Sequence, residues 1–227
     1  MVRGPRRTDL TGLALIRLLG RLTEVEVPGA KQGFAERLSQ WLGWVDAIAL
    51  SAALNGTPAA AAPEAPAAGR EEADCTAVRA AMARAIVQAC AAADDDPEAG
   101  FPAYRRRYLA RQQAMEAGIA PLRGRLRSAL GARSPELARL AAVDAVMEQV
   151  LAVRESSLLA TVPAMLAKHF ERLRQAGLAP EGGGEAPPDA AWPARFREDM
   201  QAVLLAELDV RFQPIEGLLA ALRQQPA

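Results

Sequence analysis

The residue types that most often build catalytic and metal sites are scarce in this chain. Its 227 residues include one histidine, His169, and two cysteines, Cys75 and Cys90. A nucleophilic triad would have to use His169, which we expect to be a half-exposed residue of a helix without a catalytic role. Two separated cysteines and one histidine match no zinc-ligand spacing, so the sequence predicts no metal site.

The two cysteines are also badly placed for a disulfide bond. Cys75 and Cys90 lie on one predicted helix, where fifteen residues span about 22 Å. A disulfide requires Cα atoms within about 7 Å of each other. Two free, buried thiols are therefore expected, and free thiols are typical of a reducing compartment.

Other motifs with catalytic or cofactor chemistry are missing as well. Gly182-Gly183-Gly184 lacks the lysine and the preceding strand of a phosphate-binding loop. The Glu-x-x-His pairs of di-iron helical bundles do not occur. We therefore predict no catalytic residue and no cofactor, and we expect that the protein is not an enzyme; a carboxylate-based activity is the least favoured alternative.

Neither sign of charge is in excess. Lys plus Arg and Asp plus Glu each number 27, and the lysines are Lys31 and Lys168. Proteins that bind nucleic-acid phosphates usually carry a clustered basic excess, so a nucleic-acid partner is not favoured.

The sequence also offers no clear export or membrane signal. Arg17 and Arg21 interrupt the apolar run that follows the N-terminal arginines, which is not the pattern of a signal peptide. No stretch comes near the ~20 apolar residues of a membrane span. We expect a cytoplasmic protein with no membrane insertion.

Apolar residues at helical spacing are abundant instead. They make up 51% of the chain, although aromatic residues account for only 4%, and they recur every three to four residues. This pattern predicts an all-α protein, with helices over about 9–23, 30–52, 72–93, 97–131, 135–175 and from 192 onward. Gly43 lies inside the second of these helices and favours a bend or a close contact with another helix there.

The helices are expected to fall into two parts. Residues 1–54 are predicted to form an N-terminal helical hairpin, and residues 55–71 an Ala/Pro-rich flexible linker. Residues 72–227 are predicted to form a bundle of long helices with a Gly/Pro loop near 177–191. Three of these helices contain an internal proline, namely Pro121, Pro163 and Pro214, each of which predicts a kink or a break.

Two groups of residues are candidates for binding a macromolecule. Leu38, Trp41, Trp44 and Val45 form an apolar cluster with two tryptophans three positions apart, and tryptophan is enriched at protein interfaces; packing inside a small core is the alternative interpretation. Arg105, Arg106 and Arg107 lie between two tyrosines and are the best nucleic-acid candidates, although an amphipathic helix with a solvated basic face gives the same pattern.

Two segments of the chain resemble a known protein family. Arg7-Thr8-Asp9-Leu10-Thr11-Gly12-Leu13 and Leu38-Ser39-Gln40-Trp41-Leu42-Gly43-Trp44 are similar to the opening of a proteobacterial family of uncharacterised proteins. That family has no assigned activity or catalytic residues. The resemblance implies a genomic neighbourhood with envelope proteins, and hence a cytoplasmic accessory of an envelope-associated machine.

Together these observations predict a non-enzymatic helical scaffold or adaptor that docks a protein partner of unknown identity. Long apolar stripes are typical of coiled-coil-like packing, so we also expect a homo-oligomer. The alternative is a regulatory nucleic-acid-binding protein that uses the face formed by Arg105, Arg106 and Arg107.

Overall fold

A computed structural model describes residues 12–25, 34–56, 68–91, 100–178 and 191–224, and every element within these ranges is an α-helix. The helices are α1 (Gly12–Thr23), α2 (Phe34–Trp41), α3 (Trp44–Asn55), α4 (Ala68–Ala91), α5 (Gly100–Gly131), α6 (Pro135–Leu159), α7 (Val162–Leu178) and α8 (Trp192–Gln224). The prediction of an all-α protein is confirmed. Most of the predicted linker, the predicted Gly/Pro loop and the start of the resemblance lie outside the described residues.

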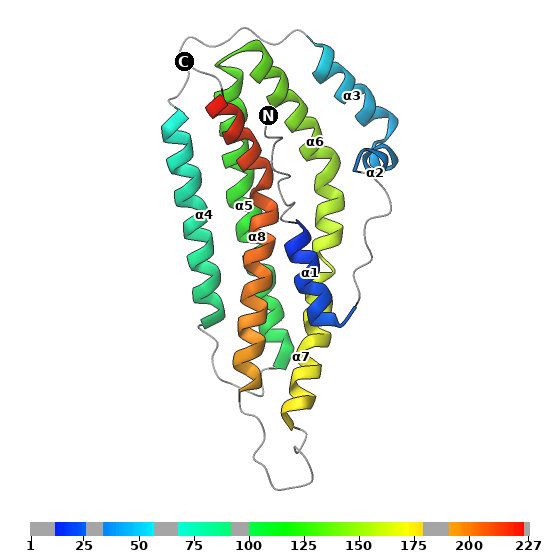
Figure 1. Cartoon of the computed structure of the whole chain (residues 1–227), viewed down its shortest axis with the longest axis vertical. Coiled ribbons are helices and arrows are strands. Elements are labelled where there is room, and N and C mark those ends of the chain that lie inside the picture. The colour runs from blue at the N-terminus through cyan, green and yellow to red at the C-terminus, as the bar shows by residue number, and fades with distance from the viewer. Residues whose placement is uncertain (1–11, 26–33, 57–67, 92–99, 179–190, 225–227) are drawn as a thin grey trace, which may run out of the picture.

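Helix α8 lies at the centre of an elongated bundle (Figure 1). It packs against α4, α5, α1 and α7, whereas α6 packs mainly against α5 and carries α3 on its other side. The central position of α8 follows from its sequence, because apolar residues occur on several of its faces rather than on one stripe. Its buried residues include Phe196, Leu204, Leu208, Phe212 and Ile215.

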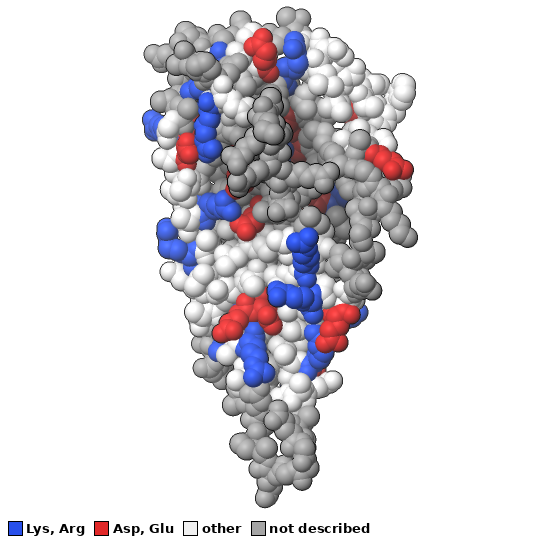
Figure 2. All heavy atoms as spheres, in the orientation of Figure 1, with Lys and Arg blue, Asp and Glu red and all other residues white. Residues whose placement is uncertain are grey.

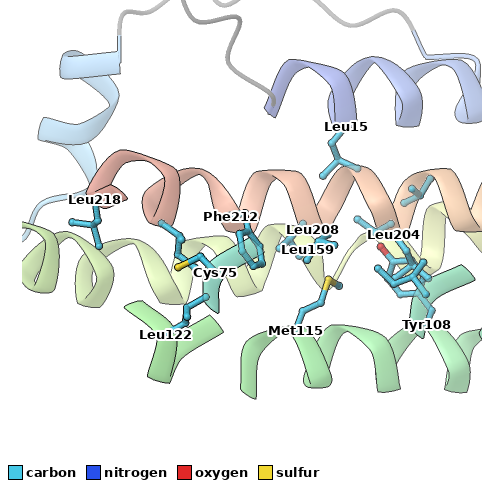
Figure 3. Close-up of a cluster of buried hydrophobic side chains, with 14 of the residues drawn as sticks. Leu15, Cys75, Tyr108, Met115, Leu122, Leu159, Leu204, Leu208, Phe212 and Leu218 are labelled. Carbon is cyan, nitrogen blue, oxygen red and sulfur yellow. The ribbon is translucent and has the colours of Figure 1, made fainter. Parts of the chain in front are cut away.

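The core is filled mainly by leucine, with a few sulfur and aromatic side chains. In the part that Figure 3 shows, Leu15 of α1, Cys75 of α4 and Met115 of α5 point toward α8. At one end of the bundle Phe101, Tyr104, Phe170, Trp192 and Phe196 form an aromatic cluster with ring centroids 5.0–6.2 Å apart. Such distances are typical of tilted and edge-to-face aromatic packing.

The three internal prolines act differently. Pro121 lies inside α5 and Pro214 inside α8. Both helices are continuous through the proline and have total lengths of 32 and 33 residues. Pro163 follows a break, because α6 ends at Leu159 and α7 begins at Val162. A proline at the second position of a helix has no hydrogen bond to lose, so the single helix expected over 135–175 is divided there. The predicted start of this segment is confirmed, since Ser134 caps α6 by accepting a hydrogen bond from the Leu137 backbone N–H at 3.2 Å.

The bend expected at Gly43 is a complete break. α2 ends at Trp41, and Gly43, with an extended backbone (φ −74°, ψ 168°), precedes the first turn of α3. Its N–H donates to the Asp46 carboxylate at 3.0 Å. An acidic side chain at the third helical position therefore stabilises the new helix start.

The helices expected to form the N-terminal hairpin lie on different parts of the bundle. α1 packs on α8 and α7, and buries Leu15 and Leu22. α3 packs on α6, at the upper right of Figure 1. α1 carries an apolar stripe, and packing on both α8 and α7 covers this stripe more completely than pairing with one neighbouring helix would. Deleting residues 1–54 would thus remove part of the core and not only a surface element.

A buried carboxylate connects three of the long helices. Glu207 of α8 is fully buried and accepts hydrogen bonds from the Tyr108 hydroxyl at 2.6 Å, from Gln112 Nε2 at 3.0 Å and from Arg211 Nε at 2.9 Å. Gln112 Nε2 also lies 3.3 Å from the Leu159 carbonyl oxygen, to which it donates. Burial and the neighbouring Glu207 charge raise the pKa of Tyr108 far above its ordinary value, so its hydroxyl stays a donor.

Replacing Glu207 by alanine is expected to destabilise the protein by about 3–5 kcal/mol. The change leaves the Tyr108 hydroxyl and Gln112 amide without an acceptor and removes the closest partner of the buried Arg211 guanidinium, and breaking such a buried pair has a cost of this size. Urea unfolding followed by circular dichroism measures the difference. Glu198→Ala, at an exposed position of the same helix, is the control and should change the free energy of unfolding by less than about 0.5 kcal/mol; equal effects of the two substitutions would contradict this account.

Candidate protein-interaction surface

Helix α3 is apolar around its whole circumference. Its sequence, WVDAIALSAALN, contains one charged residue, Asp46, and that carboxylate is engaged with the Gly43 N–H. A helix that is apolar all round is usually buried on every side, but α3 has no buried residue and contacts the bundle mainly through α6. Its outer face is therefore an apolar surface in contact with solvent.

The largest exposed side chains of this surface are among those that the sequence singled out. Trp44 is 82% exposed and Val45 is 77% exposed. Ile48 and Leu54 continue the surface at 53% and 50%. Figure 2 shows mainly uncharged atoms at the upper right, where α3 lies. We refer to Trp44, Val45, Ile48 and Leu54 as the α3 face.

Leu38 and Trp41, the other two predicted interaction residues, lie on α2 and are half-buried. The Arg154 guanidinium of α6 lies over the Trp41 ring, 5.5 Å from its centroid. A cation at this distance from an aromatic ring is attracted by it, so Trp41 attaches α2 to the bundle. The sequence allowed two interpretations of the tryptophans, an interface and internal packing. In the structure Trp44 is exposed, whereas Trp41 packs internally.

A shallow groove of about 640 Å³ runs along α3. Its walls are Trp44, Ala47, Ile48, Ser51, Ala52, Asn55 and Gly56. Leu38 and Val45, grouped together from the sequence, lie on different helices, because α2 ends at Trp41 and α3 begins at Trp44. The signal that could have located the groove is the alternation of one large residue with small ones at helical spacing.

Comparison with known proteins identifies the family of this chain. A family model described as "Protein of unknown function (DUF3348)" matches residues 1–224. The chain belongs to the DUF3348 family. No curated protein and no solved structure matched it. The resemblance to an uncharacterised family is thereby confirmed, and the family supplies no activity or functional residue for this DUF3348 protein.

The arginine triplet of this DUF3348 protein lies near the start of α5. Arg105 and Arg106 are exposed, whereas Arg107 is half-buried with its guanidinium 5.9 Å from the centre of the Tyr104 ring. Tyr104 itself belongs to the aromatic cluster. Two solvated arginines and one packed against a tyrosine are the arrangement of an amphipathic helix, and nucleic-acid binding through this face stays a prediction.

His169 differs from its sequence-based interpretation, since it is only 5% exposed. Its Nε2 lies 2.7 Å from Asp199 Oδ2, and its Nδ1 lies 3.0 Å from Arg172 Nη2. Arg172 also donates to the Leu22 carbonyl of α1 and pairs with Glu24 at 3.2 Å. This histidine connects α7 to α8 and, through Arg172, to α1. The expectation of a half-exposed residue was wrong because α7 packs against both α8 and α1, which cover the side of the helix that carries His169.

Among the described residues, no group of three or more His, Cys, Asp or Glu side chains is arranged to hold a metal ion. One stretch, Pro135–Gly177, is long and apolar enough to cross a membrane by length and composition, contrary to the expectation that no stretch comes near this length. Core helices of water-soluble proteins meet the same criterion, and a turn divides this stretch into α6 and α7. The finding by itself therefore does not place the protein in a membrane.

Replacing Trp44 by alanine is expected to leave stability nearly unchanged, within about 0.5 kcal/mol, because the side chain is mostly in solvent. Phe196→Ala is the comparison: its ring is fully buried, and truncating it should cost about 3–5 kcal/mol. Urea unfolding followed by far-ultraviolet circular dichroism checks both values. A large loss of stability for Trp44→Ala would show that this tryptophan is needed for folding.

The two cysteines are expected to be unreactive in the folded protein. Burial raises the pKa of both Cys75 and Cys90 to about 11, and the reactive species is the thiolate. Near pH 8, which lies about three units below these values, Ellman's reagent should label neither thiol of the native protein and both after unfolding in urea. Rapid labelling of the native chain would contradict the burial of these side chains.

Proposed function

We propose that this DUF3348 protein is a non-enzymatic helical adaptor that docks a protein partner through the α3 face, with Leu38 and Trp41 supporting it from α2. The observation that carries the proposal is the exposure of Trp44 and Val45, 82% and 77%, on a helix whose only charge is engaged locally. Covering such side chains with a partner removes apolar surface from water, which is the main favourable term in most associations. Tryptophan is also the residue that most often dominates binding energy.

The support beneath the α3 face fits this role. α3 is seated on α6, the Asp46 carboxylate holds its first turn, and the Arg154 guanidinium covers the Trp41 ring. A surface held in place before binding loses less conformational freedom on association. The α3 face is thus already formed before a partner binds, as this role requires.

Further support comes from α6, which is tied to α5 by partly buried ion pairs. Arg123 donates to both Asp144 carboxylate oxygens at 2.7 and 2.8 Å, and Arg127 pairs with Glu148 at 2.5 Å. Bidentate arginine–carboxylate pairs fix geometry as well as adding attraction. The platform is therefore connected to the centre of the bundle through defined contacts.

The most deeply buried acid in the described part of the chain supports a non-enzymatic role. Glu207 is fully buried and all its oxygens are engaged by Tyr108, Gln112 and Arg211. A general acid or base must reach its substrate, and a carboxylate saturated by internal donors has no free position for one. Its arrangement is that of a structural group.

We also propose that the adaptor acts on the cytoplasmic side of an envelope-associated machine, and that one of its partners is a second copy of the chain. Both parts were expectations from the sequence. Light scattering behind size-exclusion chromatography, over a tenfold range of concentration, measures self-association: a stable dimer or larger oligomer supports the second copy, and a monomer leaves a different protein as the partner.

Site-specific photocrosslinking in cells tests the α3 face directly. Benzoylphenylalanine in place of Val45 is expected to form a discrete crosslinked product, because a bound partner covers this position. Val87 of α4, which is 42% exposed, is the matched control position on another part of the bundle (Figure 1) and should give no such product. Adding Trp44→Asp should abolish the product at position 45, since a carboxylate cannot be desolvated in an apolar interface without a partner.

The pattern of products decides the proposal. A product at position 45 with twice the mass of the chain identifies a second copy, and any other discrete mass identifies a different protein for mass spectrometry. Equal crosslinking at positions 45 and 87, or none at position 45, would contradict docking through the α3 face.

A further inference from the structure

An apolar cavity of about 560 Å³ lies between α1 and the junction of α6 with α7. Leu15 and Leu19 of α1 line one wall, and Leu159, Val162 and Met165 line the opposite one. In Figure 1, α1 crosses in front of this junction. The volume lies within the about 300–1,000 Å³ that is typical of small-molecule sites, which are also mostly apolar.

The break between α6 and α7 lies in the wall of the cavity. The turn at Ala160–Thr161 interrupts the helical ladder, and the Thr161 hydroxyl is engaged by the Leu158 carbonyl at 2.7 Å. Leu158 is 61% exposed and Ile16 is 46% exposed, although both line the cavity. These two apolar side chains lie at the entrance of the open cavity, where a bound ligand would cover them.

The cavity is long, and it carries a positive charge at one end. Glu155 and Lys168 both line it and are thirteen residues apart, which corresponds to about 20 Å along the helices. The Lys168 side chain is exposed, and it has no ion pair with any residue that the structure describes. By contrast, Arg172, one turn further along α7, already pairs with Glu24 and donates to the Leu22 carbonyl.

The acid at the other end is neutralised within the protein. Glu155 pairs with Arg211 at 3.3 Å, and burial raises the pKa of the Glu155 carboxyl group. The wall between the two ends is formed by aliphatic side chains. Among the described residues that line it, the cavity thus offers one available charge, a positive one, beside a long apolar space.

We propose that this cavity binds a single long acyl chain with an anionic head group, the head group at Lys168 and the chain along α1 toward Glu155. The length, the aliphatic walls and the unpaired ammonium together select this ligand class: a neutral apolar molecule would not use Lys168, and a compact anion would not fill the space. The binding site does not depend on the adaptor function, since Trp44 and Val45 do not line the cavity.

Fluorescence titration of the full-length protein with dansyl-undecanoic acid tests the proposal. Saturable binding is expected, and laurate should displace the probe at much lower concentration than dodecanol, which has the same chain without the charge. Lysophosphatidylglycerol serves as a second competitor: whichever of it and laurate displaces the probe at lower concentration identifies a lipid or a free fatty acid as the source of the chain. The absence of saturable binding, or equal displacement by laurate and dodecanol, would overturn the proposal.

Substitutions locate the site. Leu158→Trp fills the entrance and should weaken probe binding at least about tenfold, as should Ile16→Trp from the opposite wall. Val153→Trp, at a 75% exposed position of α6 that does not line the cavity, is the control and should leave binding unchanged. Circular dichroism confirms that each variant is folded. Unchanged binding in both blocking variants would place the probe elsewhere and refute this site.

Lys168→Met separates the head group from the chain. It should weaken binding of laurate about fivefold, the size of a partly solvated ion pair, and leave binding of dodecanol unchanged. Arg174→Met, which removes an exposed positive charge paired with Glu171 on the same helix, is the control for net charge. The same loss for laurate in both variants would show that Lys168 does not contact the anion.

Discussion

The carboxylate of Glu207 and its three donors determine how the long helices lie against one another. Apolar packing alone lets leucine-rich helices slide or rotate, because many registers bury similar areas. A buried charge does not allow this freedom, since only the register that brings Tyr108, Gln112 and Arg211 to the carboxylate satisfies it. Such a network is weak evidence for net stability, and its main effect here is to fix the alignment of α5 with α8.

The same network sets the positions of the more peripheral elements. Gln112 reaches the Leu159 carbonyl at the end of α6, and Arg211 reaches Glu155 one turn earlier. The end of α6 is thereby held at a fixed position along the bundle. The turn before α7 then lies opposite α1, with the apolar cavity between them. The ion pairs of Arg123 and Arg127 fix the middle of α6 against α5, and α3 rests on the opposite side of α6. The Glu207 network and α6 thus connect the α3 face with the apolar cavity.

Much of the secondary structure could be predicted because its signals are local. The helix starts expected at 135 and 192 agree with those of α6 and α8, each of which has a proline at one of its first two positions. The helix end expected at 131 agrees with the end of α5 at Gly131. Of the residues that the sequence proposed for a protein interface, Trp44 and Val45 are exposed. Trp41 is instead covered by Arg154, which lies more than a hundred positions away in the chain, and no local pattern encodes such a contact. The cavity was not predicted, since its walls include the turn at Ala160–Thr161 and residues of α1, which packs there from far away in the sequence.

The sequence by itself determined the helical periodicity and helix ends such as the starts at 135 and 192, because these depend on hydrogen bonds and side chains within a few residues. The small share of aromatic residues, 4%, also determined that the core would be mainly aliphatic. Only the tertiary structure decided which apolar face of each helix is covered. Pro121 and Pro214 stay within continuous helices while Pro163 follows a break, and His169 is buried against Asp199 rather than half-exposed. These outcomes depend on competition between neighbouring helices for the same apolar surface, which is a property of the whole packed bundle.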